Sequence, residues 1–132
     1  MVVIYGEPQG KGRPRFTKRG NFVSTYTPKE TLSYENLVKV EYIKQSGKYY
    51  DDKELTCEIH AYFGIPKSIS KKKAELMKQK EIRPTKKPDV DNIAKIILDA
   101  LNGVAFKDDT QVVNLIVRKY YAERPRVEFD IY

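Results

Sequence analysis

The sequence has few of the side chains that carry most metal and nucleophile chemistry. Its 132 residues include one cysteine, Cys57, one histidine, His60, and no tryptophan. A single thiol forms no internal disulfide and no cysteine-ligated zinc site. A single imidazole also disfavours a histidine-ligated zinc site and a histidine-based catalytic triad. Carboxylate and lysine side chains therefore remain as the candidates for chemistry.

The chain also lacks a long apolar run. No stretch approaches the roughly 18 residues of a membrane-spanning helix. The N-terminus has no basic stretch followed by an apolar core, so no secretory leader is predicted. We therefore expect a soluble cytoplasmic protein with no membrane partner and no small-molecule cofactor. The length predicts a single domain covering residues 1–132.

Positive charge is in excess, with 25 Lys and Arg against 18 Asp and Glu and a formal net charge of +7. Such a surplus favours a polyanionic partner. Residues 9–21 contain three glycines and lack helical or strand periodicity, which predicts a flexible loop. This loop is either an ordinary solvated segment or a phosphate-contacting one, and it lacks the Walker A spacing. Its basic residues are Lys11, Arg13, Arg15, Lys18 and Arg19.

Residues 87–103 are the most informative stretch of the chain. Pro88 precedes a predicted helix and Asn102-Gly103 ends it, as helix start and stop signals do. The spacing of the apolar residues is that of one buried helical face. These residues are Val90, Ile93, Ala94, Ile97, Leu98 and Leu101.

Two carboxylates, Asp89 and Asp91, flank the mouth of this predicted helix, and Asp109 follows after a turn. If the chain brings Asp109 back to the same end, three carboxylates converge on a site suited to Mg²⁺. The alternative is that the acidic pair only caps the helix and complements its dipole. An EF-hand calcium loop is excluded because Ala94 stands where that loop needs glycine.

Elsewhere the patterns predict helices over 27–45 and from 68 or 70 to 78. Strands are predicted over 2–5, 55–63, 111–121 and 127–131, with the last two paired as a hairpin. On the strand over 55–63, Cys57 falls on the apolar face and His60 on the polar face. This order predicts an α/β or α+β domain in which helices pack on a mixed sheet.

Four segments together resemble the signature of the RusA family of Holliday-junction-resolving endodeoxyribonucleases, which are common in phages and prophages. They are residues 8–15 (PQGKGRPR), 87–95 (KPDVDNIAK), 98–103 (LDALNG) and 108–113 (DDTQVV). The resemblance covers most of the chain in the same order. It implies a homodimer with a mixed α/β fold that uses Mg²⁺, with Mn²⁺ as a possible substitute, to cut four-way DNA junctions.

Carried onto this sequence, the resemblance puts the essential carboxylates at Asp89, Asp91 and Asp109, and the functional lysine at Lys95. The carboxylates would hold the metal, and Lys95 would reach the phosphate or pair with Asp91 or Asp99. Asn92 would support the loop geometry. Asp99 is expected to be structural, because it lies about 12 Å along the helix from Asp91.

Two other functions remain open at this point. The first is a non-catalytic nucleic-acid-binding protein whose acidic residues are structural. The second is a metal nuclease that acts on flaps, replication forks or RNA, because the phosphoryl chemistry is the same. In each case the basic residues of the 9–21 segment would contact the phosphate backbone.

Overall fold

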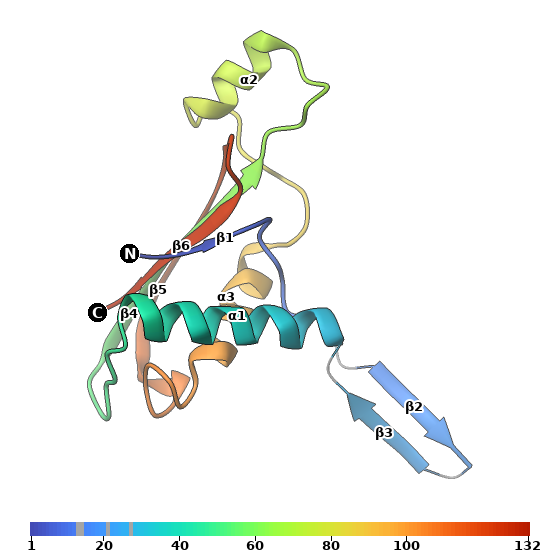
Figure 1. Ribbon diagram of the computed structural model, residues 1–132, viewed down its shortest axis with the longest axis vertical. Coiled ribbons are helices and arrows are strands. Elements are labelled where there is room, and N and C mark those ends of the chain that lie inside the picture. Colours follow the sequence, from blue (N-terminus) through green and yellow to red (C-terminus); the bar gives the residue numbers. More distant parts are fainter. Residues whose placement is uncertain (13–14, 21, 27) are drawn as a thin grey trace.

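A four-stranded mixed β-sheet forms the centre of the computed structural model, which describes residues 1–12, 15–20, 22–26 and 28–132 (Figure 1). The strands lie in the order β1 (Val2–Tyr5), β6 (Arg126–Ile131), β4 (Leu55–Gly64) and β5 (Val112–Ala122). Strand β4 runs antiparallel to β6 and parallel to β5. The prediction of a mixed sheet in an α+β domain is confirmed.

The core lies on one face of this sheet. Alternation along β4 buries Leu55, Cys57, Ile59, Ala61 and Phe63, as the period-two pattern predicts. Cys57 is fully buried, and this burial raises the pKa of its thiol to about 12. The thiol is therefore a core group rather than a nucleophile.

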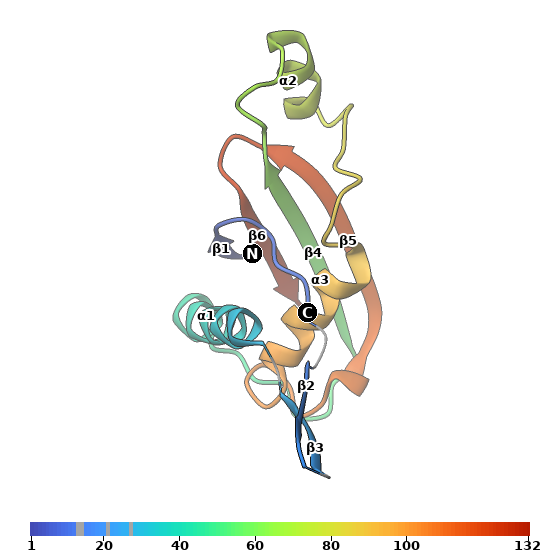
Figure 2. The same ribbon diagram turned by 90° about the vertical axis from the view of Figure 1, so that its right-hand side faces the viewer.

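Helices α1 (Lys29–Gln45) and α3 (Val90–Leu101) contribute to this core, whereas α2 (Lys71–Lys78) lies apart at one end of the sheet (Figures 1 and 2). Helix α3 buries Ile93, Ile97 and Leu101, in agreement with its predicted apolar face. Within the described residues, no helix is both long and apolar enough to span a bilayer.

The predicted hairpin between the last two strands is wrong. Strand β4 lies between β5 and β6, so the turn at residues 123–125 crosses the end of β4 near Gly64. Alternation identifies a strand but not its neighbours. Val127 and Phe129 of β6 are fully buried because β6 is an interior strand, whereas edge strand β5 has no buried side chain.

The basic N-terminal segment also differs from the prediction of an irregular loop. Strands β2 (Arg15–Arg19) and β3 (Phe22–Tyr26) pair antiparallel as a separate two-stranded sheet. This hairpin projects beyond the end of α1 (Figure 1). Helix α1 begins at Lys29, so Pro28 occupies the N-cap position rather than the first helical turn.

Candidate functional site

The site is built on the N-terminus of α3. Asp89 is the N-cap residue, and its Oδ1 accepts the backbone N–H of Asn92 at 3.1 Å. Asp91 follows in the first turn, where a negative charge suits the helix dipole. Asp89 therefore does cap the helix, but capping uses only one of its two carboxylate oxygens. The Asp89 and Asp91 side chains both remain exposed.

The electrostatics of this helix end favour a charged Asp89. The backbone N–H of Asn92 and a side-chain contact with Asp91 lower the pKa of Asp89, with a further contribution from the Lys119 ammonium. Partial burial lowers the pKa of Lys119 itself, and the charge of Asp89 opposes that shift. Two carboxylates and one cation therefore share this end of α3.

A hollow of about 630 Å³ opens beside Asp89. It lies between the N-terminus of α3 and the start of the basic N-terminal segment. Its lining consists of Pro8, Gln9, Gly10, Lys11, Lys87, Pro88, Asp89 and Asn92. The peptide bond between Lys87 and Pro88 is cis. A strand carrying phosphate groups would meet the Asp89 carboxylate and the exposed Lys87 side chain in this hollow.

Gly10 lets the N-terminal segment lie directly against α3. A Cβ at this position would stand 2.8 Å from Cβ of Pro88 and 3.1 Å from Cβ of Asn92. The next residue, Lys11, donates its backbone N–H to the carbonyl of Asn92 at 3.1 Å. Asn92 thus joins the capped helix end to the segment through its own backbone.

We predict that Gly10→Ala pushes the segment away from α3 and impairs function at this hollow. The clash should cost about 1 to 3 kcal/mol of stability and reduce the nuclease activity that the sequence resemblance implies by more than that loss explains. Gly47→Ala is a matched control, because Gly47 has a φ of +73° and lies beyond the far end of α1. Urea unfolding and cleavage assays on both variants test this. Equal losses of cleavage in the two would contradict a specific role for Gly10.

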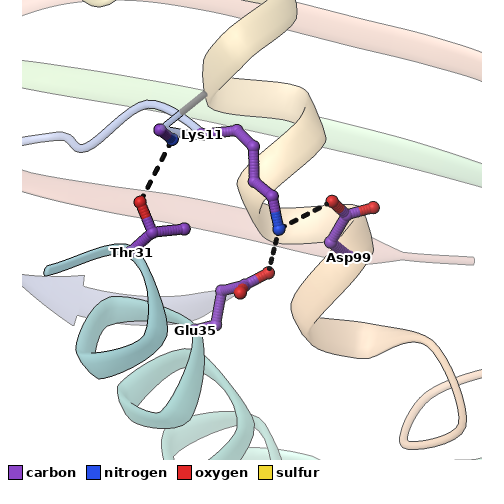
Figure 3. Close-up of polar contacts among 5 residues, drawn as sticks. Lys11, Thr31, Glu35 and Asp99 are labelled. Atoms are coloured by element: carbon purple, nitrogen blue, oxygen red, sulfur yellow. Dashed lines mark hydrogen bonds and ion pairs between the residues drawn. The ribbon is translucent and has the colours of Figure 1, made fainter. Parts of the chain in front are cut away.

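Lys11 is part of an internal ion-pair cluster rather than a free surface cation (Figure 3). Its Nζ lies 3.1 Å from Oε2 of Glu35 on α1 and 3.0 Å from Oδ2 of Asp99 on α3. Gly12, the next residue, donates its N–H to Oγ1 of Thr31. Burial lowers the pKa of Lys11, but the two carboxylates outweigh it and the net shift is upward. The structure therefore uses Lys11 and Asp99 to attach the segment to both helices.

The other predicted site residues on α3 and beyond it do not all come together. Lys95 is exposed one turn after Asp91, and no described carboxylate lies within ion-pair distance of its Nζ. Asp109 lies past the opposite end of α3, where its N–H donates to Oδ1 of Asn102 at 2.9 Å. Burial and the adjacent Asp108 raise the pKa of Asp109.

The described residues contain no group of three or more His, Cys, Asp or Glu side chains arranged around one point. The predicted convergence of Asp109 with Asp89 and Asp91 is thus absent from the single chain. The pair alone still suits Mg²⁺, which is commonly held by one or two carboxylates together with water and substrate phosphate oxygens. Asp89 and Asp91 fit such an ion by the chemistry of their donor oxygens.

Three of the remaining predicted DNA contacts belong to the hairpin. Lys18 is exposed on β2, and Arg15 and Arg19 stand at the two ends of that strand. Arg13 lies outside the described residues. Sequence reasoning missed Lys119, which donates from Nζ to the carbonyl of Lys86 at 2.6 Å. The sequence does contain a clue to this residue. Val117, Lys119 and Tyr121 alternate along β5 and so share its core-facing side, where a lysine is unusual.

Comparison with known proteins agrees with these features. The family model described as endodeoxyribonuclease RusA matches residues 5–132. The chain is also similar to "Uncharacterized protein YqaN" of Bacillus subtilis (strain 168). The two are 39% identical over 130 residues, which is 97% of this chain and 92% of that protein.

Proposed function

The chain belongs to the RusA family of endodeoxyribonucleases, and from this membership we propose that it resolves four-way (Holliday) DNA junctions by paired, Mg²⁺-dependent nicks during recombination and repair. The observation that carries the proposal is the exposed Asp89–Asp91 pair at the capped end of α3. Asp89 of this pair lines a hollow whose other wall is the start of the N-terminal segment. Exposed Lys87 lines the same hollow, so a candidate metal ligand and a cation suited to phosphate lie close together.

In the proposed mechanism, Asp89 and Asp91 would hold Mg²⁺, or Mn²⁺ in its place. When bound, the ion would activate a water and neutralise charge on the scissile phosphate. The N–H of Asn92 fixes Oδ1 of Asp89, so that carboxylate keeps one orientation when the substrate arrives. Lys95, which is exposed one turn after Asp91, and Lys119, whose charge acts on Asp89, provide positive charge for the phosphate. Asp109 stays in the proposed ligand set because of its place in the family signature.

We propose a homodimer as the active form. A four-way junction has approximate two-fold symmetry, so two identical sites related by a two-fold axis would nick opposed strands. The outward face of α1 supports self-association, because four large apolar side chains on it are between 41% and 61% exposed. These are Leu32, Leu37, Val40 and Ile43. An apolar patch of this kind on a helix indicates a contact surface.

The basic residues of the N-terminal segment over residues 9–21 are proposed to contact the phosphate backbone. Replacing Arg13 and Arg15 by Gln should weaken binding to every DNA sequence and reduce the slope of log K against log salt by about 1.8, or about 0.9 per lost phosphate contact. Fluorescence anisotropy over a salt series measures this slope. Lys48→Gln with Lys53→Gln, in the loop between α1 and β4, removes the same charge and is the control. An unchanged slope in the Arg13 and Arg15 variant would contradict a role for this segment in the DNA interface.

A substrate panel separates the proposed function from its alternatives. We expect Mg²⁺-dependent cleavage of a synthetic four-way junction and little cleavage of a linear duplex with the same arm sequences. Preferred cleavage of a flap, a replication fork or RNA would indicate a nuclease of different substrate class. Tight junction binding without a cut product over a range of metals would indicate a non-catalytic binding protein.

A further inference from the structure

A second hollow lies beside the end of α2 and the turn between β5 and β6. These elements lie at the end of the sheet far from the β2–β3 hairpin (Figure 1). It has a volume of about 570 Å³. Its wall contains four cations, Lys78, Lys80, Arg124 and Arg126, and one carboxylate, Glu123. Tyr62 lies in the same wall. We call it the Tyr62 hollow. A lining with this excess of positive charge suits an anionic ligand.

Aromatic rings hold several of these cations in place. The guanidinium carbon of Arg126 lies 4.0 Å from the ring centre of Tyr62. Lys80 and Arg83 each lie 4.6 Å from the ring centre of Tyr120, which is 5.6 Å from that of Tyr62. Stacking on a ring fixes a cation without neutralising it. The cations therefore keep their charge for a ligand while losing little side-chain freedom on binding.

Carboxylates neutralise only part of this charge. Glu123 pairs with Lys78 at 2.7 Å, and Glu128 pairs with Arg126 at 3.0 Å. In the described part of the chain, neither Lys80 nor Arg124 has a carboxylate within ion-pair distance. Both side chains are exposed. These two cations are the ones best placed to meet a phosphate group.

A cationic segment connects the Tyr62 hollow with the Asp89–Asp91 pair. Residues 80–87 run along the outer edge of β5, where Arg83 donates from Nε to the carbonyl of Lys119 at 2.9 Å (Figure 2). Lys119 in turn donates from Nζ to the carbonyl of Lys86, three residues before Asp89. From Ala122 to Lys119 the strand covers about 10 Å. That is about three base steps of a DNA duplex at about 3.4 Å each.

We propose that the Tyr62 hollow is a second anchor for a DNA arm, in which Lys80 and Arg124 bind phosphodiester groups. The cations of residues 80–87 then lead the strand along the edge of β5 toward Asp89. The proposal rests on the proposed function, because it assigns the hollow to the same substrate. It places a DNA contact on the side of the carboxylate pair away from the basic hairpin, so that the strand is held on both sides of the site.

The test is a charge-matched pair of double variants. Lys80→Gln with Arg124→Gln removes the two unpaired cations of the hollow, whereas Lys48→Gln with Lys53→Gln removes two exposed lysines in the loop between α1 and β4. Binding of a fluorescent four-way junction is measured in EDTA over a salt series. We expect the hollow variant to bind about tenfold more weakly and to lose about 1.8 from its salt slope. The control should lose much less of either.

Equal weakening and equal slopes in the two double variants would overturn the proposal, because net charge alone would then explain the effect. Cleavage by the unsubstituted protein with Mg²⁺ is scored separately. Cleavage of the junction together with equal binding by the two variants would reject the hollow and leave the proposed function standing. A selective loss of binding in the hollow variant supports the anchor even if the unsubstituted protein cuts no junction.

Discussion

Asp89→Asn is expected to reduce junction cleavage at least about a thousandfold while leaving the fold intact. Asparagine caps a helix as well as aspartate does, so this variant still accepts the N–H of Asn92 and keeps α3 capped. It removes only the negative charge that a divalent cation needs. Cleavage rates with Mg²⁺, together with thermal melting followed by circular dichroism, measure the two properties separately.

This substitution distinguishes the two interpretations of the acidic pair. If Asp89 only caps the helix, Asp89→Asn is neutral and Asp89→Ala is the damaging change, since only alanine removes the cap. Asp91→Asn should match Asp89→Asn in lost cleavage, because Asp91 is the other exposed carboxylate of the pair. Asp52→Asn, at an exposed aspartate before β4, controls for the loss of one negative charge. Full activity in Asp89→Asn would refute the metal site.

Lys11→Met is expected to destabilise the protein by about 2 to 3 kcal/mol, which lowers the melting temperature by about 10 °C. The substitution leaves Glu35, whose side chain is 11% exposed, facing Asp99 with no cation between them. It also releases the N-terminal segment from α1 and α3, so DNA cleavage should fall as well. Chemical unfolding at pH 7 gives the change in the free energy of unfolding.

Two further variants isolate the charge effect. Adding Glu35→Gln to Lys11→Met removes the uncompensated buried carboxylate and should recover part of the lost stability. Lys18→Met, at an exposed position on β2, should change stability by no more than about 0.5 kcal/mol. If Lys11→Met is no more destabilising than Lys18→Met, the cluster does not hold the segment in place.

The ion-pair cluster of Lys11, Glu35 and Asp99 also makes the stability of the protein depend on pH. The carboxylates raise the pKa of Lys11 in the folded protein above its ordinary value of 10.5, despite an opposing contribution from burial. The folded state therefore binds this proton more tightly than the unfolded state does. The stability that Lys11 contributes is fully present below pH 10.5 and disappears as the pH rises through the folded-state pKa. The stability difference between the native protein and Lys11→Met should shrink over that range.

Local signals in the sequence identify most of the elements and the acidic end of the site. Helix α3 is predicted closely because its apolar spacing, its capping Asp89 and its terminal Gly103 all act within a few residues of the helix. Strand β4 is predicted for the same reason, since its alternation is a property of the strand itself.

Contacts between distant segments could not be predicted from local patterns in the sequence. Alternation in β5 and β6 gives no indication that β4 lies between them. Lys11 stands in a run of basic residues that indicates phosphate binding, and its partners Glu35 and Asp99 come from two different helices. The Tyr62 hollow combines β4, the end of α2 and the turn before β6. No single window of the sequence contains these pairings.

The most direct test of the proposed function is to map the nicks on all four strands of an end-labelled synthetic junction, with Mg²⁺ and with EDTA. We expect nicks of equal yield at symmetric positions on two opposed strands, dependent on Mg²⁺ and absent in Asp89→Asn. Such a product requires both the metal site at Asp89 and Asp91 and a second copy of the chain. Cleavage that persists in EDTA, or that persists in Asp89→Asn, would contradict the assignment of this carboxylate pair.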